Sequence, residues 1–142
     1  MTDYVDLCII AEHFHPVLSG ASERFRRYLP GLRERGFDVR VFTIWREGLE
    51  RQEKIDGGLI NRLEMPASAL HPSAELTKQS LRYFQSSGKW PEIVHVLSHT
   101  LQGVPYLWKM RFQGITCINS ITINPVPRDH SLLGKTNFWV SR

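Results

Sequence analysis

The amino-acid sequence predicts an α/β fold: a single Rossmann-like domain with a mostly parallel sheet and helices on both faces. Short apolar runs, rich in β-branched residues, alternate along the chain with segments of helical period. Glycines stand at the points where those helices should end. The chain has 142 residues, which is enough for one domain with a core of its own.

The first strand is expected at residues 7–11, a continuous apolar run typical of a strand buried on both faces. A helix is expected at residues 21–35, capped by Ser19 or Ser22, ended by Gly36 and bent at Pro30. Its apolar face is formed by Phe25, Tyr28, Leu29 and Leu32.

The remaining elements follow in the same alternation. Further strands are expected at residues 39–44, 59–65, 93–97 and 115–121, and further helices at residues 73–87 and up to about residue 112. Residues 45–58 are expected to form a loop or a short hairpin. Right-handed crossovers then give the five strands the spatial order 3-2-1-4-5. We expect the domain at residues 1–127 and an irregular tail at residues 128–142.

Composition excludes several classes of function. The formal charge of +4 permits contact with phosphate or anionic lipid, but no arginine-rich tail indicates a nucleic-acid partner. Cys8 and Cys117 lie in apolar runs and are expected to be buried, reduced thiols. The N-terminal segment lacks the pattern of a signal peptide or a membrane span, so we expect a cytoplasmic protein.

In the predicted sheet, ligands should bind where the strand order reverses, beyond the carboxyl ends of the first and fourth strands. Loops 12–20 and 98–103 meet there, with loop 122–127 one strand away. Histidines, which exchange protons near neutral pH, are concentrated in this region. They are His13, His15, His95 and His99.

Simpler interpretations of these residues remain open. His95 can be a core histidine whose ring is satisfied by backbone groups, and His13 and His15 can be exposed loop residues. The spacing of the imidazoles is poor for a metal site, so no metal is expected.

The first loop argues against common cofactors. No G-x-G-x-x-G follows the first strand and no G-x-x-x-x-G-K-[ST] occurs, so neither a dinucleotide nor a P-loop site is expected, and we predict no cofactor. Ser19 and Gly20 nevertheless lead directly into a helix N-terminus, where backbone N–H groups can bind an anion. The alternative is a plain cap and turn.

Four segments carry a resemblance to a known family. They read E-H-F-H-P-V-L-S-G-A-S-E-R at 12–24, L-P-G-L-R-E-R-G-F-D-V at 29–39, P-E-I-V-H-V-L-S-H at 91–99 and F-Q-G-I-T-C-I-N-S-I-T at 112–122. In order and spacing, over residues 4–125, the chain resembles the N-terminal, acceptor-binding domain of the family 4 glycosyltransferases, which have two Rossmann-like domains (the GT-B type).

The resemblance implies a retaining transfer of a sugar from a nucleotide-sugar donor to a glycan or lipid acceptor. It implies that Ser19 and Gly20 lie near the donor diphosphate and that His95 is the catalytic-cleft residue beside the transferred sugar. The acceptor side of that cleft would comprise His13, His15, His99, Thr122 and Asn124.

The chain departs from the family pattern in three places. Ser19-Gly20 replaces a Gly-Gly pair, Leu97 replaces a second histidine, and residues 122–124 lack the histidine that often follows the fifth strand. The C-terminal, donor-binding domain is absent from the sequence, so we expect the chain to be inactive alone.

Two other functions compete with a glycosyltransferase half. One is a non-catalytic α/β domain that binds a nucleotide or a partner. The other is a hydrolase or epimerase, for which the crevice loops lack the necessary carboxylate pair.

The helix at 21–35 also allows a peripheral contact with an anionic membrane, because arginines flank its apolar stripe on both sides. They are Arg24, Arg26, Arg33 and Arg35. The alternative is that the stripe packs on the sheet and the arginines lie at its rim.

Overall fold

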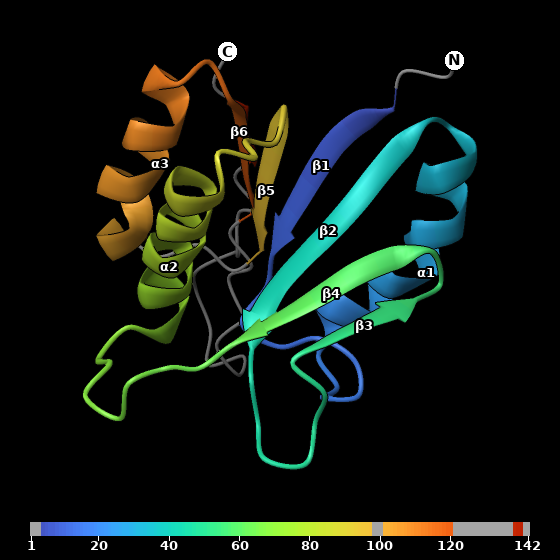
Figure 1. The fold of residues 1–142 in the computed structure, drawn as a ribbon, viewed down its shortest axis with the longest axis horizontal. Coiled ribbons are helices and arrows are strands. Elements are labelled where there is room, and N and C mark those ends of the chain that lie inside the picture. The colour runs from blue at the N-terminus through green and yellow to red at the C-terminus, as the bar shows by residue number, and fades with distance from the viewer. Residues whose placement is uncertain (1–3, 98–100, 121–137, 141–142) are drawn as a thin grey trace, which may run out of the picture.

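The computed structural model describes residues 4–97, 101–120 and 138–140. A twisted sheet separates two helical layers: α2 (Pro72–Ser87) and α3 (Val104–Phe112) cover one face, and α1 (Gly20–Glu34) covers the other (Figure 1). A short 3₁₀ helix, η1 (Leu101–Gly103), leads into α3. The predicted α/β class with helices on both faces is therefore confirmed.

Parallel pairing forms the centre of the sheet. β1 (Val5–Ile10) lies between β2 (Phe37–Ile44) and β5 (Ile93–Leu97), parallel to both. Outside these strands, β4 (Gly58–Leu63) pairs in parallel with β2, and β6 (Thr116–Ser120) pairs in parallel with β5.

The full strand order is β3-β4-β2-β1-β5-β6-β7, so the predicted order 3-2-1-4-5 needs correction. The five predicted strands are β1, β2, β4, β5 and β6, but two antiparallel edge strands were missed. β3 (Gln52–Ile55) lies within the segment expected as a loop or short hairpin, and β7 (Phe138–Val140) within the range expected to be irregular.

A tight hairpin creates the first of these edge strands. Asp56 and Gly57 connect β3 to β4, with φ angles of 49° and 87°. Two successive residues with positive φ are typical of the type I′ turn, for which Asp-Gly is a favoured sequence.

The predicted ends of α1 and α2 agree closely with the structure. The Ser19 hydroxyl accepts a hydrogen bond from the Ser22 N–H at 3.2 Å, which caps the start of α1. Gly36, with φ of +86°, follows the end of α1, and Gly88, with φ of +66°, ends α2. Pro30 lies inside α1, and the bend predicted there stays a prediction.

Side chains that alternate along the strands fill two cores, one on each face of the sheet. On the α1 face, Leu29 is fully buried, and its methyl groups approach Gly58 so closely that a Cβ there would lie 3.1 Å from Cδ1. Both cysteines are buried free thiols, as predicted. Burial raises the pKa of the Cys8 thiol, and it raises that of Cys117 to about 11, so both are protonated at neutral pH.

We expect Leu29→Ala to lower the free energy of unfolding by about 3 kcal/mol, because it leaves a cavity between α1 and the sheet. Urea unfolding followed by circular dichroism measures the change. The matched control is Leu18→Ala, whose side chain is 79% exposed and which should cost less than about 0.5 kcal/mol. Equal costs for the two variants would mean that α1 does not pack as described.

Candidate functional site

The loop that follows β1 is held in place by side chains from β2, β4 and the segment after β2. The Thr43 hydroxyl donates to the Glu12 carbonyl at 3.3 Å, and a guanidinium nitrogen of Arg46 lies 3.1 Å from Nδ1 of His13. The main-chain N–H of Ala11 donates to the carbonyl of Phe42 at 3.0 Å. These bonds fix the path of the loop from the end of β1 towards α1.

Arg62 on β4 is the buried charged group that holds this loop, at 3% exposure. Its guanidinium donates to the carbonyls of His15 and Glu50, each at 2.8 Å, and to the carboxylate of Glu53. A buried cation needs such partners to offset its loss of hydration. Arg62 therefore ties the β1 loop to the β3–β4 hairpin.

At the other end of the loop, the start of α1 is closed by two serines. The hydroxyls of Ser19 and Ser22 lie 2.6 Å apart, and the Ser22 hydroxyl also lies within donating distance, 3.1 Å, of the Ser19 carbonyl. The Ser19 cap uses the N–H of Ser22 and leaves the N–H groups of Gly20 and Ala21 leading the helix. A Cβ at Gly20 would meet no atom within 4 Å apart from its own neighbours along the chain, so the position of a side chain there is open.

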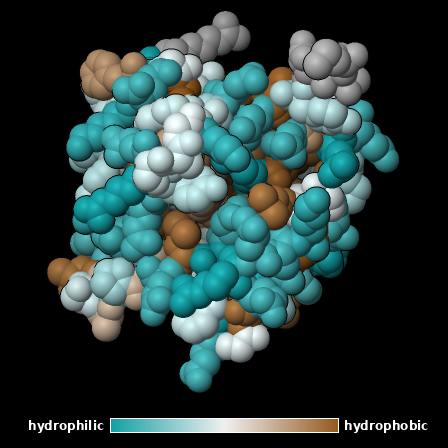
Figure 2. Space-filling model, in the orientation of Figure 1, coloured by the Kyte–Doolittle hydropathy of each residue, from teal (hydrophilic) through white to brown (hydrophobic). Residues whose placement is uncertain are grey.

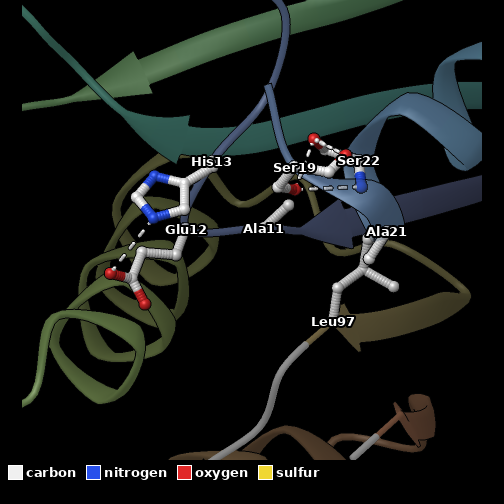
Figure 3. A pocket seen from close by; sticks show the side chains of 7 residues that line it. All are labelled: Ala11, Glu12, His13, Ser19, Ala21, Ser22 and Leu97. Atoms are coloured by element: carbon white, nitrogen blue, oxygen red, sulfur yellow. Dashed lines mark hydrogen bonds and ion pairs between the residues drawn. The ribbon is translucent and has the colours of Figure 1, made fainter. Parts of the chain in front are cut away.

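A small hollow of about 70 Å³ lies between the loop, the start of α1 and the end of β5 (Figure 3). Glu12 and His13 lie on one side of it and Ser19 and Ser22 on the other, with Ala11 between them. The His13 Nε2 and a Glu12 carboxylate oxygen are 3.7 Å apart. The lining residues are Ala11, Glu12, His13, Ser19, Ala21, Ser22 and Leu97.

His95 lies on β5 beneath α1, outside the lining of this hollow. Its Nε2 is 2.8 Å from the Ser120 hydroxyl, and its ring packs edge-on against Phe25, with centroids 4.9 Å apart. Burial lowers the pKa of His95, so the ring is neutral near pH 7. The partner of this ring nitrogen is therefore a side-chain hydroxyl and not a backbone group.

The predicted site residues are thus only partly brought together. His13 and Ser19 line the same hollow, while the carbonyl of His15 is bound by Arg62. Gly20 stands at the start of α1 beside that hollow. His99, Thr122 and Asn124 lie outside the described residues. The functional roles of all these residues stay predictions.

Sequence reasoning missed three residues that shape the site. Glu12 directly follows the first strand, beside His13, and that position was a usable signal. Arg62 interrupts the apolar pattern of its strand, which could have marked a buried charge with a distant partner. Ser120 could not be paired with His95 from local sequence, because 25 residues separate them.

Two further observations concern metals and membranes. Among the residues that the structure describes, no three His, Cys, Asp or Glu side chains are grouped so that they could hold a metal ion. Within the same residues, no helix combines the length and apolar character that a bilayer crossing requires.

The fold and the hollow at the reversal of strand order define a doubly wound, Rossmann-like α/β domain. The chain is structurally similar to the catalytic domain of starch synthase IV from Arabidopsis thaliana, bound to ADP and acarbose. The TM-score is 0.66 and the sequence identity 12%, and the match covers 82% of this chain and 33% of that one. The chain is also similar to sucrose-phosphate synthase from Thermosynechococcus elongatus, with a TM-score of 0.57 and 16% identity over 81% of this chain and 32% of that one. Both are glycosyltransferases of the GT-B type.

The same fold also occurs in a hydrogenase domain. The C-terminal domain of the PF1911 hydrogenase from Pyrococcus furiosus matches with a TM-score of 0.51 and 9% identity, over 84% of this chain and 93% of that one. No protein-family model and no curated protein matches the sequence. At these identities the likeness establishes the fold, and the chain spans about a third of the two glycosyltransferase structures.

We expect Arg62→Met to lower the free energy of unfolding by about 3 kcal/mol, because the three part-buried, charge-assisted hydrogen bonds of the guanidinium are lost. Urea unfolding measures the loss. Arg51→Met is the matched control: Arg51 pairs with Glu64 at 2.9 Å but its side chain is 53% exposed, so the cost should stay within about 1 kcal/mol. A loss for Arg62→Met no larger than for the control would contradict the role of Arg62 in joining the loop after β1 to the β3–β4 hairpin.

We expect the imidazole of His95 to titrate below the ordinary histidine value of about 6.5, because burial disfavours its charged form. The unfolded chain then binds this proton at a higher pH than the folded protein. Stability should fall as the pH drops from about 6.5 to the folded pKa, with no further change from this group below it. NMR titration of the ring protons measures the pKa, and the signal that disappears in His95→Gln identifies the residue. A midpoint at or above the ordinary value would refute the buried environment.

Proposed function

We propose that this chain is the acceptor-side half of a retaining glycosyltransferase of family 4, and that it is inactive without a donor-binding domain. The observation that carries the proposal is the hollow at the reversal of strand order, where the ends of β1 and β5 meet the capped start of α1. The fold likeness to two glycosyltransferase structures supports it.

In this proposal, the start of α1 is the part of the site that faces the donor diphosphate. Backbone N–H groups at a helix N-terminus carry a partial positive charge, which favours a phosphate oxygen. Ser19 is engaged in capping, so Gly20 and its open surroundings would provide the approach.

The other polar groups belong to the acceptor side. The adjacent carboxylate and imidazole of Glu12 and His13 can hydrogen-bond sugar hydroxyls from one wall of the hollow. We assign His95 to the cleft as a neutral ring whose position is set by Ser120 and Phe25. The assignment of His15, His99, Thr122 and Asn124 to the acceptor side rests on the sequence resemblance.

The membrane contact expected through residues 21–35 is a separate part of the proposal, and the structure limits it. The apolar stripe of α1 packs on the sheet through Phe25, Leu29 and Leu32. Arg26 pairs with Glu23 and Asp56. An electrostatic contact through α1 would therefore use its exposed arginines without burying the stripe in lipid.

A second candidate is a non-catalytic domain that binds a nucleotide or a partner. Its support is the match to the C-terminal domain of the PF1911 hydrogenase, because the same fold then occurs in a protein that is not named as a glycosyltransferase. Leu97 adds to it, since an apolar side chain lines the hollow where the family pattern has a second histidine.

Gly20→Asp tests the proposed donor side. An aspartate there meets no steric obstacle and suits a helix N-terminus, so the fold should be retained, while its charge repels a diphosphate. We expect the chain alone to bind ADP-, UDP- or GDP-sugars no more tightly than about 1 mM, and to transfer sugar only when a donor-binding domain is supplied in trans. Gly20→Asp should reduce that transfer at least about tenfold.

His71→Asp is the matched control, because it places the same charge at the uncapped start of α2. It should leave transfer unchanged. Micromolar nucleotide binding by the chain alone, with no transfer in trans, would favour the second candidate. Equal losses in the two variants would contradict a phosphate site at α1.

A further inference from the structure

Two loops at the edge of the sheet where the strands end are joined by a contact between side chains. A guanidinium nitrogen of Arg46, in the loop after β2, lies 3.1 Å from Nδ1 of His13, in the loop after β1. A guanidinium can only donate hydrogen bonds, so Nδ1 must accept this one. The proton of the neutral imidazole is then on Nε2, and the contact selects one of the two tautomers of His13.

The loop after β2 holds Arg46 in a defined place. The Arg46 carbonyl accepts from the N–H of Leu49 at 3.1 Å, and Gly48 has a φ of +84°, the sign that the third residue of a type II turn requires. The Trp45 indole N–H donates to the Leu49 carbonyl at 2.7 Å. In Figure 1 this loop extends beyond the end of β2, and Figure 2 shows that the surface in the same orientation is mostly hydrophilic. Arg46 is itself exposed, so it reaches the imidazole from an ordered surface turn and can be replaced without disturbing the core.

The other ring nitrogen of His13 faces a carboxylate in the wall of the hollow. Nε2 lies 3.7 Å from a carboxylate oxygen of Glu12, too far for a hydrogen bond, and both side chains line the same wall (Figure 3). With its proton on Nε2, the imidazole presents a donor beside the acceptor of Glu12. A hydroxyl group can accept from the first and donate to the second, whereas an ammonium group can only donate and the carboxylate repels a phosphate.

We propose that Arg46 is a positioning residue, which fixes His13 in the Nε2–H form so that Glu12 and His13 together bind a neutral hydroxyl group. The inference rests on the proposed function and deepens it, because it names an uncharged alcohol of the acceptor as the group bound at this wall. The opposite wall, at the start of α1, favours an anion. The two walls therefore have different charge preferences, which orients a substrate with its hydroxyl at Glu12 and its phosphate at α1.

The ring nitrogens of His13 report the effect of Arg46 without a sugar donor or a second domain. In ¹⁵N NMR at about pH 8.5, above the ordinary range of histidine titration, we expect the Nε2–H form to exceed the Nδ1–H form at least about tenfold. Arg46→Met removes the donor and should leave a mixture of the two forms. Arg46→Lys keeps a charged donor and should lie between the parent chain and Arg46→Met. The signals that disappear in His13→Gln identify the residue.

Neutral sugars test the hydroxyl site itself. The probes are methyl hexosides of gluco, galacto and manno configuration, each titrated up to about 100 mM. At least one of them should shift the ring signals of His13 saturably, while glucuronate should not, because Glu12 repels its carboxylate. Arg46→Met should raise the Kd of the hexoside that binds at least about threefold, since the imidazole is no longer held in the donating form.

The matched control is Arg51→Met, which removes another exposed arginine from the connection between β2 and β3, one that pairs with Glu64. It should leave the His13 signals and the Kd unchanged, and circular dichroism checks that the variants fold. A mixture of tautomers in the parent chain, equal changes in Arg46→Met and the control, or no shift with any of the hexosides would overturn the proposal. Neither measurement involves sugar transfer, so failure here is distinguishable from failure of the glycosyltransferase proposal in the Gly20→Asp test.

Discussion

The candidate site depends on the parallel pairing of β1 with both β2 and β5. This pairing places the carboxyl ends of the central strands on one edge of the sheet and obliges the chain to cross back through helices. The start of α1 must then lie at the edge where β1 ends. Burial of apolar side chains on both faces stabilises the arrangement, and Leu29 closes one face because Gly58 leaves room for it.

Polar contacts determine the path of the loop after β1, at the edge of the sheet where the strands end. The loop after β1 could follow many paths between its two fixed ends, and each additional ordered residue costs conformational entropy. Thr43, Arg46 and Arg62 offset part of that cost by binding its backbone and His13. Because Arg62 also binds Glu53, the hairpin at the sheet edge and the loop at the hollow are parts of one hydrogen-bonded unit.

The sequence predicted those elements whose signals are local. Apolar runs marked the five long strands, and the Ser19 cap, Gly36 and Gly88 marked the ends of helices. β3 was missed as a strand because its residues, Gln-Glu-Lys-Ile, are polar, and its pairing with β4 is set by the Asp56-Gly57 turn. β7 pairs with β6 from a distant part of the chain, which no local period reveals.

The candidate site likewise has parts with a local sequence signal and parts without one. The cap at Ser19 and the place of the hollow could be predicted, because both follow from one helix start and from strand topology. The partners of His95 and Arg62 could not, since Ser120 and Glu53 reach them only through the folded sheet. We expected a cluster of imidazoles because residues at or near the ends of neighbouring strands often share one surface. His95 instead lies two residues before Leu97 on the same face of β5, where Phe25 of α1 covers it, apart from the lining of the hollow.

The hollow is small, which limits what the described residues can do to a substrate on their own. At about 70 Å³, the hollow is too small to enclose a nucleotide sugar. A surface of this kind can bind one edge of a substrate but cannot exclude water from a reacting bond, and most of the electrostatic stabilisation in glycosyl transfer needs that exclusion. The two glycosyltransferase structures devote about two thirds of their length to other parts of the chain. If this domain acts in sugar transfer, its own residues position and orient the substrate, and the charge that develops on the leaving diphosphate must be met largely by a second domain.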